Sequence, residues 1–144
     1  MRITNQNDWI EIEFRQYAKE NEYMIQGLID KDNCVEIDFN FHIENDGWGC
    51  VGDEFFYTQD IKALAEGFMK VLFGKRNLFT YSAGYPYKNS TPDPFYTFSL
   101  SRDNTQVVVT LRIHDRLSDY ISVTENMELS KFERITDELK QAAK

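Results

Sequence analysis

The stretch Val35-Glu36-Ile37-Asp38-Phe39-Asn40-Phe41-His42-Ile43-Glu44 decides the fold class, because apolar and polar residues alternate in it without a break over ten positions. Alternation with a period of two is typical of a β-strand that buries one face and exposes the other to water. We therefore expect its apolar side chains to point into a core. Its other face is mostly acidic, and this is the first hint of function in the sequence.

Strands are also predicted on both sides of this stretch. Trp9 to Tyr17 and Tyr23 to Ile29 precede it, and Trp48 to Tyr57 follows after the turn-forming residues Asn45-Asp46-Gly47. Four strands joined by short turns predict an antiparallel meander.

A helical period replaces the strand period at residues 59–73. Thr58 is a candidate N-cap, Gly74 is a candidate C-cap, and Gly67 is expected to allow close approach to a strand. We expect this helix to lie across the apolar face of the sheet. Its apolar stripe consists of Ile61, Leu64, Ala65, Phe68, Val71 and Leu72.

The second half of the chain predicts more strands and a closing helix. The strands are expected at Asn77 to Ala83, Phe95 to Ser101, Val107 to His114 and Tyr120 to Val123, with a proline-containing loop at 84–94. The capping-box sequence Ser130-Lys131-Phe132-Glu133 opens a helix at 131–143. The sequence therefore predicts one α+β domain over residues 1–144, a mostly antiparallel sheet of about seven to eight strands packed against two helices.

Composition indicates a folded protein of the cytoplasm. The chain has 144 residues, of which 42% are hydrophobic, and no apolar run approaches the roughly 18 residues of a membrane span. The first residues contain no apolar segment of the kind found in signal peptides. The two cysteines, Cys34 and Cys50, fit free thiols, although their spacing would also permit a bridge.

The net charge of −8 is unevenly distributed. Residues 1–60 carry a net charge of −10, and residues 61–144 carry +2. Such a field repels nucleic acid and anionic membranes and speeds association with a basic protein. Solubility alone would explain the acidity equally well.

No motif for catalysis, metal binding or cofactor binding stands out. The glycines at 47–52 lack the lysine of a P-loop. Glu36, Asp38, His42 and Glu44 share one strand face, but alternate strand residues lie about 7 Å apart, so this row could not encircle an ion. His114 and Asp115 are adjacent on a strand and point to opposite faces. We expect no enzymatic activity, no metal and no cofactor.

The order of elements resembles the WapI-type immunity proteins, which neutralise bacterial polymorphic toxins. The resemblance rests on Trp48-Gly49, on the helix start Thr58-Gln59-Asp60-Ile61-Lys62-Ala63-Leu64, and on Leu78-Phe79 after that helix. The hairpin from Phe95 to His114 and the closing helix at 131–143 occupy matching places. Immunity proteins of contact-dependent inhibition systems are a broader class with a similar layout. No toxin-binding residue is carried over from either.

The resemblance implies binding and stoichiometric occlusion of a cognate toxin domain, and the acidity suggests that this toxin is basic and nuclease-like. The alternative is a small ligand-binding or regulatory domain with a pocket between sheet and helix. The oligomeric state is left open. The residues expected to contact the partner are Glu11, Glu13, Glu36, Asp38, Glu44, Asp46, Trp48, Asp53 and Glu54.

Overall fold

A computed structural model describes residues 1–14, 34–44, 47–84, 94–114 and 120–143, with the backbone alone at residues 36, 47–55 and 94. The first half forms an antiparallel four-stranded sheet, sheet A, in the order β1-β2-β3-β4. Its strands are β1 (Arg2–Asn5), β2 (Asp8–Phe14), β3 (Cys34–Ile43) and β4 (Gly47–Tyr57), and β4 leads into helix α2 (Thr58–Leu72).

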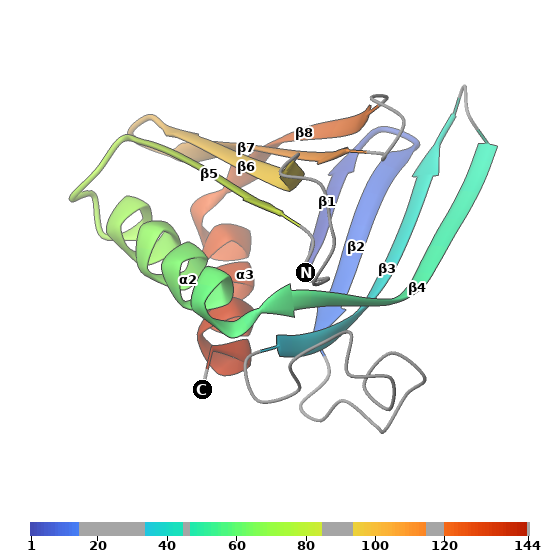
Figure 1. Cartoon of the computed structure of the whole chain (residues 1–144). Helices are drawn as coiled ribbons and strands as arrows, with labels where there is room; N and C mark the ends of the chain where they lie inside the picture. Colours follow the sequence, from blue (N-terminus) through green and yellow to red (C-terminus); the bar gives the residue numbers. More distant parts are fainter. Residues whose placement is uncertain (15–33, 45–46, 85–93, 115–119, 144) are drawn as a thin grey trace.

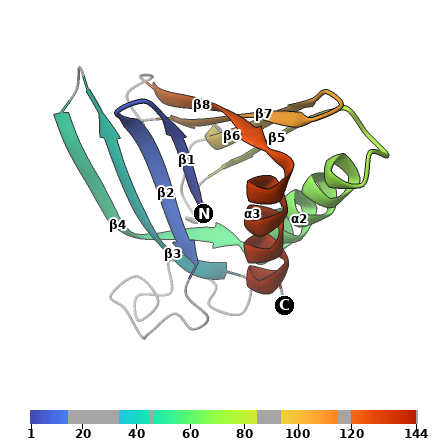
Figure 2. The same ribbon diagram turned by 180° about the vertical axis from the view of Figure 1, so that it is seen from behind.

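The second half repeats this plan. Sheet B is antiparallel in the order β5-β6-β7-β8, and helix α3 follows it. Its elements are β5 (Leu78–Gly84), β6 (Pro94–Arg102), β7 (Gln106–His114), β8 (Tyr120–Glu128) and α3 (Leu129–Ala142). The strands of the two sheets run in different directions, and α2 and α3 lie side by side beneath sheet B (Figures 1 and 2). The predicted α+β class with two helices is confirmed.

Strand β3 follows the alternation that predicted it. Ile37 and Phe39 are fully buried, whereas Asp38 and Asn40 on the other face are partly exposed. Val35, Phe41 and Ile43 pack at the edge of the same core. The pairing of β3 with the edge strand β4 shifts register between Ile37 and Phe39, which marks a bulge within this strand pair.

The inner face of β3 meets the other sheet, and this corrects the prediction that a helix covers it. The Phe39 ring lies 6.5 Å from the Phe95 ring of β6, and Phe56 of β4 stacks on Tyr96 of β6 at 4.3 Å. Helix α2 packs instead beneath sheet B, where Phe68 lies 5.5 Å from Phe98 of β6. The core is therefore built between the sheets by aromatic rings.

Both helices begin one or two residues before their predicted starts. Their N-cap positions are Tyr57 and Glu128, neither of which makes a side-chain capping hydrogen bond. The proposed N-cap at Thr58 and the capping box at Ser130 are therefore wrong. The reason is that each helix follows a strand directly, so the last strand residue is already in the extended conformation that an N-cap needs.

The C-terminal end of α2 agrees with the sequence. Gly74 has a positive φ of 72°, its N–H donates to the carbonyl of Val71, and the N–H of Lys75 donates to the carbonyl of Lys70. This is the Schellman pattern, which favours glycine. Gly67 also allows the expected close approach, because a Cβ built there would lie 2.1 Å from Cζ of Phe79 on β5.

The strands differ from the prediction in three places. Strand β1 was not predicted, and it pairs with β2 through Arg2 to Asn5. The strand expected at Tyr120 to Val123 continues to Glu128. The strand expected at Tyr23 to Ile29 lies outside the described residues, and β2 pairs directly with β3.

The outer face of sheet B is covered by neither helix nor sheet A (Figures 1 and 2). In β7, Val107, Val109, Leu111 and Ile113 are buried as predicted, and the residues between them face outward. Cross-strand register extends this face over all four strands. We name it the hydroxyl face after its short side chains, which are Thr80, Ser82, Thr97, Ser99, Ser101, Thr110, Ser122 and Thr124.

Candidate functional site

The outer face of sheet A gathers the predicted acidic residues that the structure describes. Glu13 of β2 lies directly opposite Asp38 of β3, and Glu11 lies opposite Asn40 in the neighbouring row. Glu13 is exposed, while Glu11 and Asp38 are partly exposed. Carboxylates directly opposite each other on one sheet face repel and weaken the pairing. This face, defined by Glu11, Glu13 and Asp38, is called the acidic face below.

Aromatic and cationic side chains border the acidic face. The Arg2 guanidinium carbon lies 4.4 Å from the centroid of the Trp9 ring, and an Arg2 nitrogen lies 3.9 Å from a carboxylate oxygen of Glu11. The Trp9 ring lies 6.3 Å from the ring of His42, its register partner on β3. His42 donates a hydrogen bond from Nδ1 to the carbonyl of Asn7 at 2.7 Å, since a carbonyl only accepts.

This grouping of Arg2, Trp9 and His42 was not predicted as a partner-binding feature. The three residues come from different strands, and only the register of β1, β2 and β3 brings them together. The signal in the sequence was the polar alternation around Trp9, which identified the strand but not its neighbours. Trp and Arg are the residue types most enriched at the centres of protein interfaces.

The other predicted contact residues are only partly placed. Glu44 is exposed in the turn after β3, where its N–H donates to the Asp8 carboxylate at 2.8 Å. On the β4 backbone, Trp48 lies opposite His42 and Glu54 lies opposite Ile37. For Glu36 in β3 and Asp53 in β4 the structure describes the backbone only, and Asp46 lies outside the described residues.

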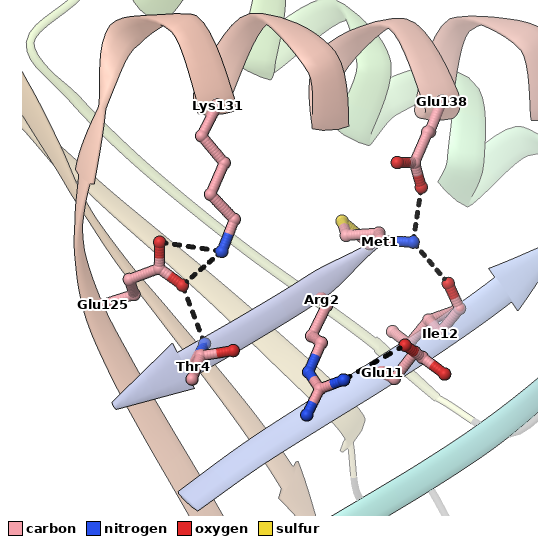
Figure 3. A network of polar contacts seen from close by, with 8 residues as sticks. All are labelled: Met1, Arg2, Thr4, Glu11, Ile12, Glu125, Lys131 and Glu138. Atoms are coloured by element: carbon pink, nitrogen blue, oxygen red, sulfur yellow. Dashed lines mark hydrogen bonds and ion pairs between the residues drawn. The ribbon is translucent and has the colours of Figure 1, made fainter. Parts of the chain in front are cut away.

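A polar network fixes β1 beside the acidic face (Figure 3). The Thr4 N–H donates to Oε1 of Glu125 on β8 at 2.8 Å, and Nζ of Lys131 on α3 donates to both oxygens of that carboxylate, at 2.6 and 2.9 Å. The amino group of Met1 donates to the carbonyl of Ile12 at 2.8 Å and forms an ion pair with Glu138. Sheet A is thereby attached to sheet B and to α3.

A second polar cluster lies where α2 meets sheet B. The hydroxyl of Tyr81 donates to Asp60 at 2.6 Å. Burial raises the pKa of Asp60, although the hydrogen bond from Tyr81 opposes this, and burial together with Asp60 raises the pKa of Tyr81 to about 12. Burial also raises the pKa of Tyr96, whose hydroxyl makes no hydrogen bond to the described residues.

The described residues offer little for catalysis or metal binding. Among them, no three His, Cys, Asp or Glu side chains are grouped to hold a metal ion. Asp115 lies outside the described residues, and His114 lies 6.1 Å from the ring of Tyr120. Cys34 is buried and lies opposite Tyr57 on the β3–β4 ladder, whereas Cys50 lies several residue pairs away, opposite Asn40. In the same ranges, no helix is long and apolar enough to cross a membrane.

The ligand pocket of the alternative reading was expected between sheet and helix, and aromatic rings occupy that region. Phe68 of α2 stacks on Phe132 of α3 at 5.4 Å and meets Phe79 of β5 edge-on at 6.4 Å. Phe98 closes the same cluster from β6. Such packing is typical of a filled core and gives no support to a ligand site between α2 and sheet B.

Comparison with known proteins identifies the family and supports the fold. The sequence matches the immunity protein WapI-like family over residues 1–144. No curated protein matches it. Among solved structures it is similar to the "Crystal Structure of WHY3 from Arabidopsis thaliana", with a TM-score of 0.51, 14% identity, and coverage of 99% of this chain and 85% of that chain. At this identity the similarity concerns the fold alone.

Proposed function

The chain belongs to the immunity protein WapI-like family, and on this premise we propose that it binds and neutralises a cognate toxin domain by occlusion, without performing chemistry itself. The finer part of the proposal is that this toxin domain is basic and that the acidic face contacts it. The family match over the whole chain carries the first part, and the charge and placement of Glu11, Glu13 and Asp38 carry the second.

The acidic face suits this role because it places carboxylates at outward positions of neighbouring strands. Glu13 of β2 and Asp38 of β3 lie directly opposite each other, and like charges in such a cross-strand pair repel. A basic partner would relieve that repulsion on binding, and the field of the first sixty residues would steer the partner to this side. Trp9 and Arg2 would add contact area beside the charges.

The experiment starts from the genome, where a gene for a large secreted toxin is expected immediately upstream. Its toxin domain is expressed with and without this chain in a susceptible host. Restored growth and a complex with one copy of each protein support the proposal. A toxin domain that kills equally well with this chain present, and that does not bind it, would contradict the immunity function.

The contact surface is tested separately by reversing two acids. The variant Glu13→Lys/Asp38→Lys keeps two like charges opposite each other on the β2–β3 pair. We expect its affinity for the toxin domain to fall about 10- to 100-fold, since like charges at an interface are costly. The matched control is Glu133→Lys/Asp137→Lys, which changes the net charge equally at exposed positions of α3. Equal affinity of both variants would reject the acidic face but not the immunity function.

A further inference from the structure

The hydroxyl face is nearly free of charge in a chain whose net charge is −8. Among the outward positions of β5 to β8 that the structure describes, only Arg112 and Glu128 carry a formal charge. The guanidinium of Arg112 lies 4.3 Å above the ring of Tyr120 on the neighbouring strand. A large sheet face without charge is unusual for a solvated surface, because charged residues are depleted mainly at interface centres.

The hydroxyl groups of this face partly satisfy one another. The hydroxyls of Ser82 and Thr97 lie 2.8 Å apart, and those of Thr110 and Thr124 lie 2.9 Å apart, each pair bridging two strands. Burying a polar group is costly mainly when it loses its hydrogen bonds. Hydroxyls that are already paired within the sheet can be covered by a partner at low cost, and short side chains lose little rotamer freedom.

Exposed apolar side chains lie on the same face. Leu78 is 67% exposed and Val108 is 37% exposed, and both pair with Ser101, so they lie in one cross-strand row. Tyr120 is 56% exposed at the far edge. These side chains supply the apolar surface that association needs.

We propose that the hydroxyl face binds a second copy of this chain, face to face. Two copies that each carry −8 repel through their acidic surfaces and approach most easily where charge is lacking. This face offers no acidic residue at its centre to which a basic toxin domain could bind. Four strands about 4.8 Å apart, three of nine residues and β5 of seven at about 3.4 Å per residue, give a footprint of roughly 550 Å² per copy. This is somewhat below the roughly 800 Å² per partner of a standard interface, so the dimer is expected to be weak.

The test is sedimentation equilibrium of this chain alone, from about 1 μM to about 1 mM, which brackets a weak dissociation constant. We expect a monomer–dimer equilibrium that strengthens when salt is raised from about 50 to about 500 mM, because screening reduces repulsion between acidic copies. Binding of a basic toxin domain at the acidic face should weaken over the same range. The two interfaces therefore respond to salt with opposite signs.

The variant Val108→Lys/Thr124→Lys places like charges at the centre of the face, and both positions are exposed. We expect its dimer dissociation constant to rise at least about tenfold. The control Ser130→Lys/Gln141→Lys adds the same charge at exposed positions of α3 and should leave the dimer intact. Each of three results would overturn the proposal. They are a monomer throughout the concentration range, a dimer that weakens as salt rises, and a dimer whose dissociation constant is unchanged by Val108→Lys/Thr124→Lys. So would loss of toxin binding by this variant while the unmodified chain stays monomeric.

Discussion

Removal of the Glu125 carboxylate should loosen the junction between the two sheets. Glu125 accepts hydrogen bonds from the Thr4 N–H and from Nζ of Lys131, and its side chain is only 15% exposed. A hydrogen bond to a charged group contributes about 1.5–3 kcal/mol to stability. The bonds from Lys131 contribute less, because that side chain is partly exposed to solvent. We therefore expect Glu125→Ala to lower the free energy of unfolding by about 2–3 kcal/mol. At this chain length, that lowers Tm by about 6–10 °C.

The assay is thermal and urea unfolding followed by circular dichroism. Glu125→Gln keeps an acceptor for Thr4 but loses the charge, so it should cost about half as much. The matched control is Glu66→Ala, which removes an exposed partner of Lys70 within α2 and should change stability by no more than about 0.5 kcal/mol. If Glu125→Ala were as mild as Glu66→Ala, the network would not hold the sheets together.

Three further predictions concern packing and burial. Gly67→Ala should lower the free energy of unfolding by about 1–2 kcal/mol, although alanine has the better helix propensity, because the new methyl group meets the Phe79 ring. In the Phe79→Ala background the same change should stabilise the protein. Equal effects in both backgrounds would refute the clash. Tyr96→Phe removes a buried hydroxyl that makes no hydrogen bond to the described residues, so stability should stay unchanged or rise by about 1 kcal/mol. A loss of more than about 1 kcal/mol in urea unfolding would show that this hydroxyl has a hydrogen-bond partner. The pKa of Asp60 is raised in the folded state, so the folded chain holds the carboxyl proton more tightly than the unfolded chain. Stability therefore falls as pH rises from the unfolded pKa of 3.8 through the folded pKa. Asp60→Asn should flatten this part of the profile of stability against pH, and an unchanged profile would assign the pH dependence to another group.

Local periodicity predicted the elements whose two faces differ. Strand β3 and strand β7 were recognised because buried and exposed residues alternate along them. Strand β1 was missed because Ile3 is its single fully buried residue, and one apolar residue defines no period. Its pairing with β2 joins nearby residues such as Arg2 and Glu11, whereas the contact of Thr4 with Glu125 joins residues 121 positions apart.

Long-range packing was beyond the sequence for the same reason. The apolar face of β3 required a cover, but the pattern could not distinguish a helix from the aromatic side of sheet B, where Phe39 meets Phe95. The candidate site shows the same division. Alternation placed Glu11, Glu13 and Asp38 on outward positions, whereas register was needed to bring Arg2 and Trp9 beside them.

The most direct test of the account is the salt dependence of the affinity between this chain and the toxin domain encoded beside it. We expect binding that weakens steadily as salt rises, and a clearly shallower dependence for Glu13→Lys/Asp38→Lys than for the control on α3. An affinity that does not respond to salt, or one that the two acid reversals leave unchanged, would contradict recognition of a basic toxin through the acidic face of sheet A.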